Sequence, residues 1–435
     1  MKNVKHLEDI VELIKATILL SETNKTSSPY FFICGAGISC PEIPTASRII
    51  ELCKEQVALR YKKKPTYFEK FVEESERLRM FSMKYYSYWI EKAYPNRADR
   101  SGFFKKLISG SKISTAVLLL AQILNSEKIT RTVFTTNFDE NLERALNLIG
   151  TDEVFTADNP RDNLALELDN RSIQIAHVHG SYRFYDCANL DTEIVQITQG
   201  EEVANVSQSL SFFLQSKAPI IVGYSGWEDD AIMQCLKNRL SAPTPYNYLW
   251  VCYSNDDYEL LPEWLKNNNC VIFAVPESSS DDCSQIEKEI LLSEQQKKPQ
   301  QIAATTFFGR LISEFEITPP ILFTNPYIYF SNLVQKLLPD NEDVFHLRRW
   351  ADRMQIWGAS ESEGDKLITL LETASAKKDY SAINDLLDTK MEKDFWRLAE
   401  CAYVYKSIIV PLVRNEEVVS DLNILLKFHS SILKF

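Results

Sequence analysis

The chain has no C-x-x-C pair among its nine cysteines in 435 residues. Structural zinc sites and many redox sites need cysteines paired at that spacing. Several cysteines instead lie inside apolar runs, as Cys252 does within Trp250–Tyr253, and this is typical of buried, reduced thiols. The cysteines therefore predict a cytoplasmic protein without a zinc site.

The sequence also lacks an apolar run long enough to cross a membrane. The longest run, 116–124, is interrupted by Gln122 and is far shorter than the roughly 20 residues that a bilayer requires. At the start of the chain, apolar residues recur at helical spacing with acidic residues between them. This is the pattern of an amphipathic helix and not of a signal-peptide core. We therefore expect no membrane partner.

The chain has fewer basic than acidic residues, with 48 lysines and arginines and 60 aspartates and glutamates. Its formal net charge is therefore −12. A surface for nucleic acid needs a positive face that replaces the counterions around phosphates. We therefore expect no direct binding to nucleic acid, although a local basic groove is compatible with this total. The hydrophobic content of 45% is that of an ordinary globular protein, and the length suggests two or three domains.

Short apolar runs alternate with helix-length segments over much of the chain. Apolar strands joined by helical crossovers indicate a parallel sheet that is covered on both faces. The stretch of about 51–130 is longer than one crossover requires, and it is rich in tyrosine and phenylalanine. We therefore predict a helical insertion there that folds over the sheet. The predicted strands span 30–35, 131–136, 172–179, 219–224, 247–253 and 270–275.

The composition changes after the last predicted strand. Polar stretches at 278–282 and 294–301 are followed by sequence with helical spacing and no strand alternation. We therefore predict two domains, an α/β domain over 1–315 and an all-α C-terminal domain over 316–435. Because the C-terminal helices carry no chemical motif, we expect them to serve assembly or partner docking.

Polar and small residues follow the predicted strands at one edge of the sheet. In a doubly wound sheet, ligands bind at the carboxyl ends of the strands, near a switch in strand order. The first strand runs into Gly35-Ala36-Gly37, where missing Cβ atoms let backbone N–H groups approach an anion such as a pyrophosphate. The later strands end in Thr136-Asn137-Phe138-Asp139, His177-Val178-His179-Gly180, Gly223-Tyr224-Ser225 and Ser254-Asn255. Their recurrence at one edge predicts a single shared cleft.

Together these motifs resemble the sirtuin superfamily. The resemblance covers about 28–276 and leaves out the C-terminal domain. It implies a Rossmann-like α/β fold that binds NAD, here as a substrate. The matching motifs are Gly35-Ala36-Gly37-Ile38-Ser39 with Ile43-Pro44 behind it, Thr136-Asn137-Phe138-Asp139, His179-Gly180 and Gly223-Tyr224-Ser225, in the family's order.

The resemblance also implies a role for each matching residue. His179 would be the catalytic base, a task that suits histidine because its unperturbed pKa of about 6.5 lies near working pH. Asn137 would orient the attacking water with an amide that donates and accepts, and Asp139 would accept from the carboxamide of nicotinamide. The residues that would contact the dinucleotide are Gly35, Ala36, Gly37, Ile38, Pro44, Thr136, Gly223, Ser225 and Asn255.

The sequence departs from the deacetylases of that superfamily. It lacks their zinc-binding cysteine pairs, it has Thr45-Ala46-Ser47 where they continue with Asp-Phe-Arg, and residues 227–230 replace their peptide-binding stretch. The pattern is closer to the sirtuin-like NADases of bacterial anti-phage defence, above all the subunit that pairs with a HerA-type ATPase. This resemblance implies an NAD-depleting effector of abortive infection that forms a homo-oligomer and binds such a partner.

The predicted activity is therefore that of an NAD⁺ glycohydrolase, which cleaves the nicotinamide–ribose bond to give nicotinamide and ADP-ribose. Two alternatives stay open, namely a regulatory subunit that senses NAD or ADP-ribose without turnover, and an NAD-dependent protein deacylase. The presence of both Asn137 and His179 favours the enzyme over the sensor, because a sensor needs no base beside the ribose.

Neighbouring polar residues receive structural interpretations. By two-residue alternation His177 shares a strand face with His179, and we interpret it as a packed or hydrogen-bonded neighbour. A His-x-His metal site has no carboxylate or thiolate partner at suitable spacing in the sequence, so we expect no metal. The acidic pair at 229–230 is typical of the start of a helix.

Overall fold

The structure is a computed structural model that divides into two compact units, Met1–Pro320 and Ile321–Phe435. Within the described part of the chain, every helix is too short or too polar to span a membrane. The residues that the structure describes are 3–79, 82–151, 153–158, 165–169, 171–182, 203–228, 230–276, 301–337, 345–359 and a few positions between 370 and 382.

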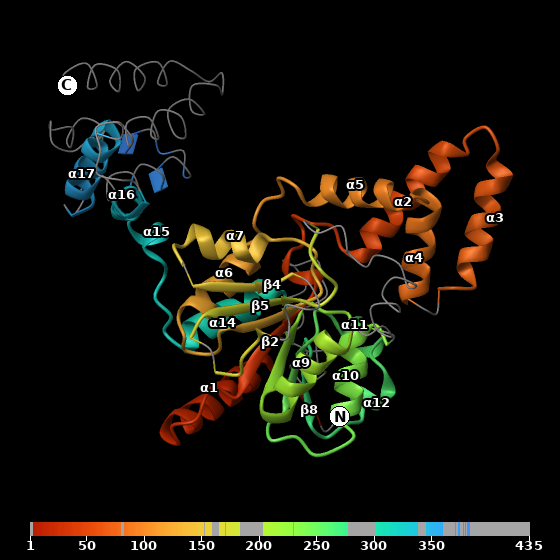
Figure 1. Ribbon diagram of the computed structural model, residues 1–435, viewed down its shortest axis with the longest axis horizontal. Coiled ribbons are helices and arrows are strands. Elements are labelled where there is room, and N and C mark those ends of the chain that lie inside the picture. Colours follow the sequence, from red (N-terminus) through yellow and green to blue (C-terminus); the bar gives the residue numbers. More distant parts are fainter. Residues whose placement is uncertain are drawn as a thin grey trace. The chain divides into compact units, whose positions relative to one another are not determined.

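Unit 1 is built on one sheet of eight parallel strands in the order β1-β8-β7-β6-β2-β3-β5-β4 (Figure 1). This confirms the predicted α/β fold with a parallel sheet, and all six predicted strands are present. The strands span Val4–Lys5 (β1), Tyr30–Cys34 (β2), Thr132–Thr135 (β3), Val154–Ala157 (β4), Ile173–His177 (β5), Ala218–Val222 (β6), Tyr248–Val251 (β7) and Val271–Ala274 (β8).

The two strands that the sequence did not predict, β1 and β4, lie at the two edges of the sheet. The central strands are buried along their whole length, as in Tyr30–Cys34. They therefore appear in the sequence as continuous apolar runs. β1 has only two residues, and β4 is half-buried over three of its four. Short, partly exposed edge strands give too weak a pattern to be recognised in sequence.

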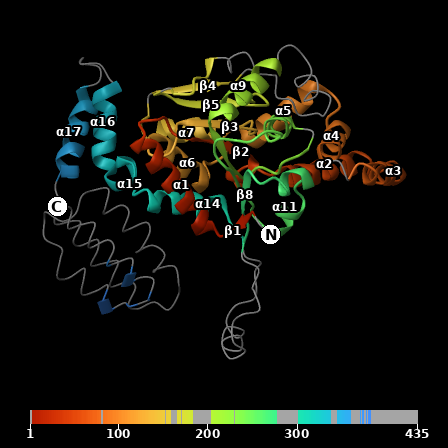
Figure 2. The same ribbon diagram turned by 90° about the horizontal axis from the view of Figure 1, so that it is seen from below.

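Helices cover both faces of the sheet, and two adjacent residues of β2 mark the two sides. The ring of Phe31 packs on Phe213 of α9 at 5.7 Å, whereas the ring of Phe32 packs on Phe308 of α14 at 5.9 Å. On the Phe32 side, α14 packs against both α1 and α6, and α6 packs against α7. On the other side, α9 packs against α10 (Figures 1 and 2). These helices span Leu7–Thr23 (α1), Thr115–Asn125 (α6), Asn141–Leu148 (α7), Ala304–Glu314 (α14), Val203–Ser216 (α9) and Ala231–Arg239 (α10).

Capping side chains fix where several helices begin near the carboxyl edge of the sheet. Ser114 accepts from the N–H of Val117 at the start of α6, and Asp230 accepts from the N–H of Ile232 at the start of α10. Ser254 caps α11 (Asn255–Glu259), which precedes the short α12 (Glu263–Lys266). Such caps satisfy N–H groups that have no partner inside the helix.

Four helices after β2 form the predicted insertion, and they carry a second apolar core around the fully buried Trp89. They lie together as a group apart from the helices that cover the sheet (Figures 1 and 2). The insertion is shorter than the predicted 51–130, because α6 packs into the core of the sheet instead. The insertion helices are Ala46–Arg60 (α2), Pro65–Glu76 (α3), Ser82–Ala93 (α4) and Arg97–Ile108 (α5).

The described part of unit 2 is helical. It contains α15 (Ile321–Thr324), α16 (Pro326–Leu337) and α17 (Phe345–Ala359). α16 packs against α17, and the buried Ser331 donates a hydrogen bond of 2.8 Å to the carbonyl of Ala351. The helical pattern predicted around 395–400 lies outside the described residues.

Candidate active site

A cavity of about 760 Å³ opens at the carboxyl ends of β2, β3, β6 and β7. β2 lies between β3 and β6, so the strand order reverses beside it, and this is where doubly wound sheets bind their ligands. The volume lies within the range of sites for cofactor-sized molecules. We call it the sheet-edge cavity, and its polar side chains at the sheet are Ser39, Asn137, Asp139, His179 and Asp230.

The glycine turn after β2 packs directly against the turn after β6. A Cβ on Gly35 would lie 2.5 Å from the carbonyl oxygen of Gly223, and a Cβ on Gly37 would lie 2.7 Å from the Cα of Gly223. Gly223 itself has a φ of +66°, which favours glycine. The two turns form the floor of the cavity, and their close contact explains why these positions are glycine.

The N–H groups of this turn are less available to an anion than the sequence predicted. The N–H groups of Gly35 and Gly37 donate to the carbonyls of Val222 and Gly223, at 3.2 and 2.9 Å. The N–H groups of Ile38 and Ser39 donate within the turn, to Gly35 and Ala36. Two of the three N–H groups of the Gly35-Ala36-Gly37 turn, to which the sequence assigned the pyrophosphate, are thus used inside the protein, as are the next two along the chain.

A chain of hydrogen bonds links Asn137 to Asp139 through Ser39. The amide Nδ2 of Asn137 donates to Ser39 Oγ at 3.0 Å, and that hydroxyl donates to Asp139 Oδ2 at 3.0 Å. The other carboxylate oxygen of Asp139 accepts from the N–H of Asn141. Burial raises the pKa of Asp139 above its usual value, and the hydrogen bonds from Asn141 and Ser39 limit the rise.

One polar atom of this network has no partner. The Oδ1 atom of Asn137 is buried and accepts no hydrogen bond from the described residues, and the side chain as a whole is 8% exposed. Buried acceptors without a partner cost free energy and are rare in native proteins. The amide is therefore oriented by Ser39 so that its oxygen is left to a donor that the described residues do not provide.

His179 follows β5 and lines the cavity beside Asp230. Its Nε2 atom lies 3.2 Å from Oδ1 of Asp230, and the two side chains are 8% and 3% exposed. Burial alone would raise the pKa of Asp230, but the charge and hydrogen bond of His179 and the N–H of Ile232 lower it below its usual value. Asp230 is therefore an anion that caps α10 and contacts the imidazole at once.

His177 does not reach the cavity and has carboxylates of its own. Its Nδ1 donates to the carbonyl of Asn137 at 2.8 Å, its Nε2 lies 2.7 Å from Glu143 Oε1, and Asp158 Oδ1 lies 3.7 Å away. Burial would lower the pKa of His177, but Glu143, Asn137 and Asp158 raise it to about 9. The expectation that the first histidine is structural agrees with these contacts.

Two details of the sequence prediction for this strand are wrong. β5 ends at His177, so the chain is no longer extended at His179, and two-residue alternation does not place both rings on one face. The prediction that no carboxylate accompanies the first histidine also fails, because Glu143 and Asp158 bring ligand atoms within 4.8 Å of its ring. Both acids come from elements remote in sequence, which spacing cannot reveal.

The insertion provides the apolar wall of the cavity. Met83 and Tyr86 of α4 and Phe104 of α5 line it, together with Trp227 from the loop after β6. The rings of Tyr86 and Trp227 lie 5.6 Å apart. The cavity therefore has a polar side at the sheet and an aromatic side at the insertion, which suits a ligand with a flat ring and polar substituents.

The charges around the cavity are acidic. Among the described lining residues, the ionisable groups with a negative charge are Asp139, Asp230 and Asp257, and none of the lining residues is a lysine or an arginine. Arg100 of α5 is buried and donates to the carbonyls of Tyr94 and Pro95. The described cavity thus offers a cationic ligand group more electrostatic support than a phosphate monoester.

The structure brings most of the predicted site residues to one place. The three predicted catalytic residues, Asn137, Asp139 and His179, line the sheet-edge cavity together. Three of the predicted contact residues do not line it, namely Gly35, Ile38 and Asn255, whereas Tyr253 and Asp257 beside Asn255 do. The predicted contact residues that line the cavity are Ala36, Gly37, Pro44, Thr136, Gly223 and Ser225.

Two residues of the site, Ser39 and Asp230, make contacts that the sequence did not indicate. Ser39 belongs to the glycine motif, but its link between Asn137 and Asp139 spans about one hundred positions and has no local signal. Asp230 was interpreted as a helix start, which is correct, but its second contact with His179 is equally remote in sequence. Only the fold brings these pairs together.

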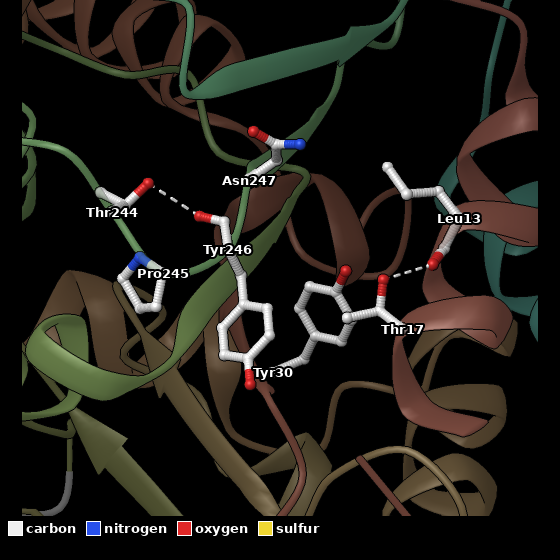
Figure 3. A pocket seen from close by; sticks show the side chains of 7 residues that line it. All are labelled: Leu13, Thr17, Tyr30, Thr244, Pro245, Tyr246 and Asn247. Atoms are coloured by element: carbon white, nitrogen blue, oxygen red, sulfur yellow. Dashed lines mark hydrogen bonds between the residues drawn. The ribbon is translucent and has the colours of Figure 1, made fainter. Parts of the chain in front are cut away.

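A second, smaller cavity of about 170 Å³ lies where β2 and β7 begin, at the opposite edge of the sheet. Figure 3 shows its lining, in which Tyr30 and Tyr246 stand with their rings 6.4 Å apart. The hydroxyls of Thr17 and Thr244 donate to the backbone carbonyls of Leu13 and Tyr246. These polar groups satisfy the protein's own backbone, so we assign this cavity no function.

The fold and the site together define a doubly wound α/β protein with a ligand cavity at its switch point. Residues 131–273 match the family model for the SIR2-like domain. This region, about a third of the chain, runs from β3 into β8 and includes Asn137, His179 and Asp230 but not the glycine turn after β2. No curated protein matches the chain. The matched region is sirtuin-like, and SIR2-like domains bind NAD.

Proposed function

We propose that the chain is an NAD⁺ glycohydrolase whose reaction takes place in the sheet-edge cavity. The observation that carries the proposal is the pairing of two groups at the cavity floor. Asn137 Oδ1 is a buried acceptor without a partner in the described protein, and His179 stands in the same cavity with a carboxylate behind its ring. An acceptor for a ribose hydroxyl or a water, beside a base, is what hydrolysis at the ribose requires.

NAD is compatible with the donors and acceptors of the cavity. Its nicotinamide ring is flat and cationic, which fits the aromatic wall of Tyr86 and Trp227 and the acidic lining of the cavity. A ribose hydroxyl or a bound water can donate to Asn137 Oδ1 and satisfy it. The pyrophosphate would rest on the loops after β2 and β6, with donors other than the four N–H groups already used in the glycine turn.

In the proposed reaction the bond between nicotinamide N1 and ribose C1′ breaks, and its electron pair leaves with nicotinamide. Water forms the new bond to C1′ and gives its proton to His179, so the products are ADP-ribose and neutral nicotinamide. Glycosidic cleavage passes through an oxocarbenium-like state.

The test is release of nicotinamide by the purified full-length chain, alone and with an added ATPase of the HerA type, measured by chromatography. We expect His179→Ala and Asn137→Ala to lower kcat by about 10²–10⁴-fold, the usual contribution of one acid–base group. The exposed Asn238 and His346 give matched controls, Asn238→Ala and His346→Ala, which are expected to retain the wild-type rate. Unchanged turnover in His179→Ala would rule out its role as the base.

The two alternatives predict other results in the same assay. A sensor of NAD or ADP-ribose would bind NAD in a calorimeter but release no nicotinamide under any condition. A deacylase would release nicotinamide only when an acylated peptide is present. Because a base beside an oriented amide is needed for cleavage and not for recognition, we favour the glycohydrolase.

We further propose that the enzyme depletes NAD during phage infection, as a homo-oligomer that acts with a partner such as a HerA-type ATPase. The support is the resemblance of the motifs at Gly35, Asn137, His179 and Gly223 to the NADases of anti-phage defence. Light scattering should then give a multiple of the chain mass of 50.1 kDa. In infected cells that express the chain, NAD should fall with wild type and persist with His179→Ala.

A further inference from the structure

We propose that Asp230 is a positioning residue that fixes the tautomer of His179, so that Nδ1 of the ring is the atom that accepts the proton. The inference rests on the proposed function for its catalytic consequence, but the tautomer itself can be observed without turnover. It adds a residue to the reaction and specifies which nitrogen does the chemistry.

The geometry places the carboxylate on one ring nitrogen only. Asp230 Oδ1 lies 3.2 Å from His179 Nε2, and both side chains are at least nine-tenths buried. Among the described residues no hydrogen bond occupies Nδ1 of His179. A buried carboxylate accepts hydrogen bonds and cannot donate one, so Nε2 carries a proton, and in the neutral imidazole the lone pair lies on Nδ1.

Asp230 is held in place independently of the histidine. Its N–H donates to the carbonyl of Trp227 at 3.0 Å, and its Oδ1 accepts from the N–H of Ile232 at 3.1 Å. The nine-residue helix α10 directs its N-terminal dipole at this carboxylate, which favours the ionised form. The anion is therefore fixed by the backbone before the imidazole contacts it.

The same contacts allow a simpler interpretation, in which Asp230 only caps α10 and merely touches the histidine. Three substitutions separate the two roles. Asp230→Ser keeps a good capping side chain but removes the carboxylate from Nε2. Asp230→Asn keeps the shape and leaves an amide oxygen where Oδ1 both caps α10 and contacts Nε2, so it removes the charge but retains the tautomer. Asp230→Ala removes both the cap and the partner of the ring.

The kcat values of these variants should follow the tautomer of His179 and not the shape of the side chain at position 230. We expect Asp230→Ser to lower kcat about 10–100-fold, and Asp230→Asn to lower it less, because its amide oxygen still accepts from Nε2. KM for NAD should stay within about threefold, because binding groups are unchanged. Adding Asp230→Ser to His179→Ala should cause no further loss.

Opposite rankings would overturn the proposal. A capping residue alone would leave Asp230→Ser as active as Asp230→Asn and would lower thermal stability most in Asp230→Ala. A direct contact between Asp230 and the substrate would raise KM and would add to the effect of His179→Ala. Full activity in Asp230→Ser would remove any role for the carboxylate.

The tautomer can be read directly by ¹H–¹⁵N correlation of the ring nitrogens in full-length protein labelled on histidine. The chain has five histidines, and His179→Ala assigns the signal of interest. We expect a protonated Nε2 and an unprotonated Nδ1 in wild type and in Asp230→Asn, and a mixture of the two tautomers in Asp230→Ser. A protonated Nδ1 in wild type contradicts the proposal. If wild type cleaves no NAD under any condition, only the proposed function fails, and this measurement still decides the tautomer.

Discussion

The ring of His177 donates from Nδ1 to the backbone carbonyl of Asn137 over 2.8 Å. This bond connects a partly buried charged cluster to the loop that presents the proposed catalytic amide. The cluster consists of His177, Glu143 and Asp158. Its electrostatics therefore bear on both the stability of the fold and the shape of the site.

The first prediction concerns the pH dependence of stability. Burial would lower the pKa of His177, but Glu143, Asn137 and Asp158 raise it from 6.5 to about 9. A raised pKa in the folded state means that the interaction stabilises the protein fully below pH 6.5. This contribution is lost as the pH rises from 6.5 through 9.

Glu143→Gln tests this cluster. The neutral amide no longer holds the imidazolium, so we expect the free energy of unfolding at pH 6.5 to fall by about 1–3 kcal/mol and the decline between pH 6.5 and 9.5 to become shallower. Urea unfolding at the two pH values measures both effects. Glu51→Gln removes an exposed acid that pairs with Arg48 and should change little. If the free energy of unfolding declined equally between pH 6.5 and 9.5 in Glu143→Gln and in wild type, the decline would not come from the pairing of His177 with Glu143.

The second prediction concerns Ser39, which joins Asn137 to Asp139. Ser39→Ala leaves an amide N–H and a carboxylate oxygen without their buried partner, which should cost about 1–3 kcal/mol of stability. Because the amide of Asn137 then loses its orientation, we expect kcat for NAD cleavage to fall at least about tenfold, or about 1.4 kcal/mol in the barrier.

Ser241→Ala is the matched control for Ser39→Ala, since its exposed hydroxyl only donates to the carbonyl of Asn238. Its stability should stay within about 0.5 kcal/mol of wild type. Thermal melts and nicotinamide release measure the two effects. If Ser39→Ala lost stability but kept full turnover, the hydroxyl would be structural only.

The third prediction concerns the contact between the turns after β2 and β6. Gly37→Ala places a methyl group 2.7 Å from the Cα of Gly223, a backbone atom that cannot move aside cheaply. We expect a loss of about 1–3 kcal/mol from overpacking, with weaker NAD binding because both turns floor the cavity. Gly102→Ala, at an open position inside α5, should instead stabilise by about 0.5–1 kcal/mol.

Melting temperatures of the two glycine variants and calorimetric titration with NAD provide the comparison. Similar melting temperatures for Gly37→Ala and Gly102→Ala would show that the turns can separate without cost.

The fourth prediction concerns the choice between NAD and NADP. The described lining of the cavity has three aspartates and neither lysine nor arginine, so a 2′-phosphate would meet negative charge without a cationic partner. We expect kcat/KM for NADP at least about tenfold below that for NAD, a difference of about 1.4 kcal/mol. Parallel assays of nicotinamide release measure the ratio. Equal use of both dinucleotides would mean that a cation outside this lining reaches the phosphate.

The central strands could be predicted from sequence because they are buried on both faces. Tyr30–Cys34 and Ala218–Val222 are buried throughout, so each is a continuous apolar run that needs no partner to be recognised. The edge strand β1 could not be predicted, because two residues carry no pattern and acquire a structure only by pairing with β8.

The site was predictable in part for a related reason. Parallel strands present their carboxyl ends at one edge, so the polar residues after β3 and β5 must gather there. The directions of their side chains could not be predicted. His177 and His179 are two residues apart, yet one binds Glu143 and the other binds Asp230 in the cavity.

The sequence by itself determined a parallel α/β sheet, a helical insertion, and a set of polar strand ends that includes Asn137, Asp139 and His179. These follow from local patterns of burial and from the geometry common to all parallel sheets. Only the tertiary structure decided that Gly37 is required by Gly223, that Ser39 orients Asn137, and that Asp230 contacts His179. Each of these is a contact between segments far apart in the chain, and such contacts exist only once the core has brought the strands together.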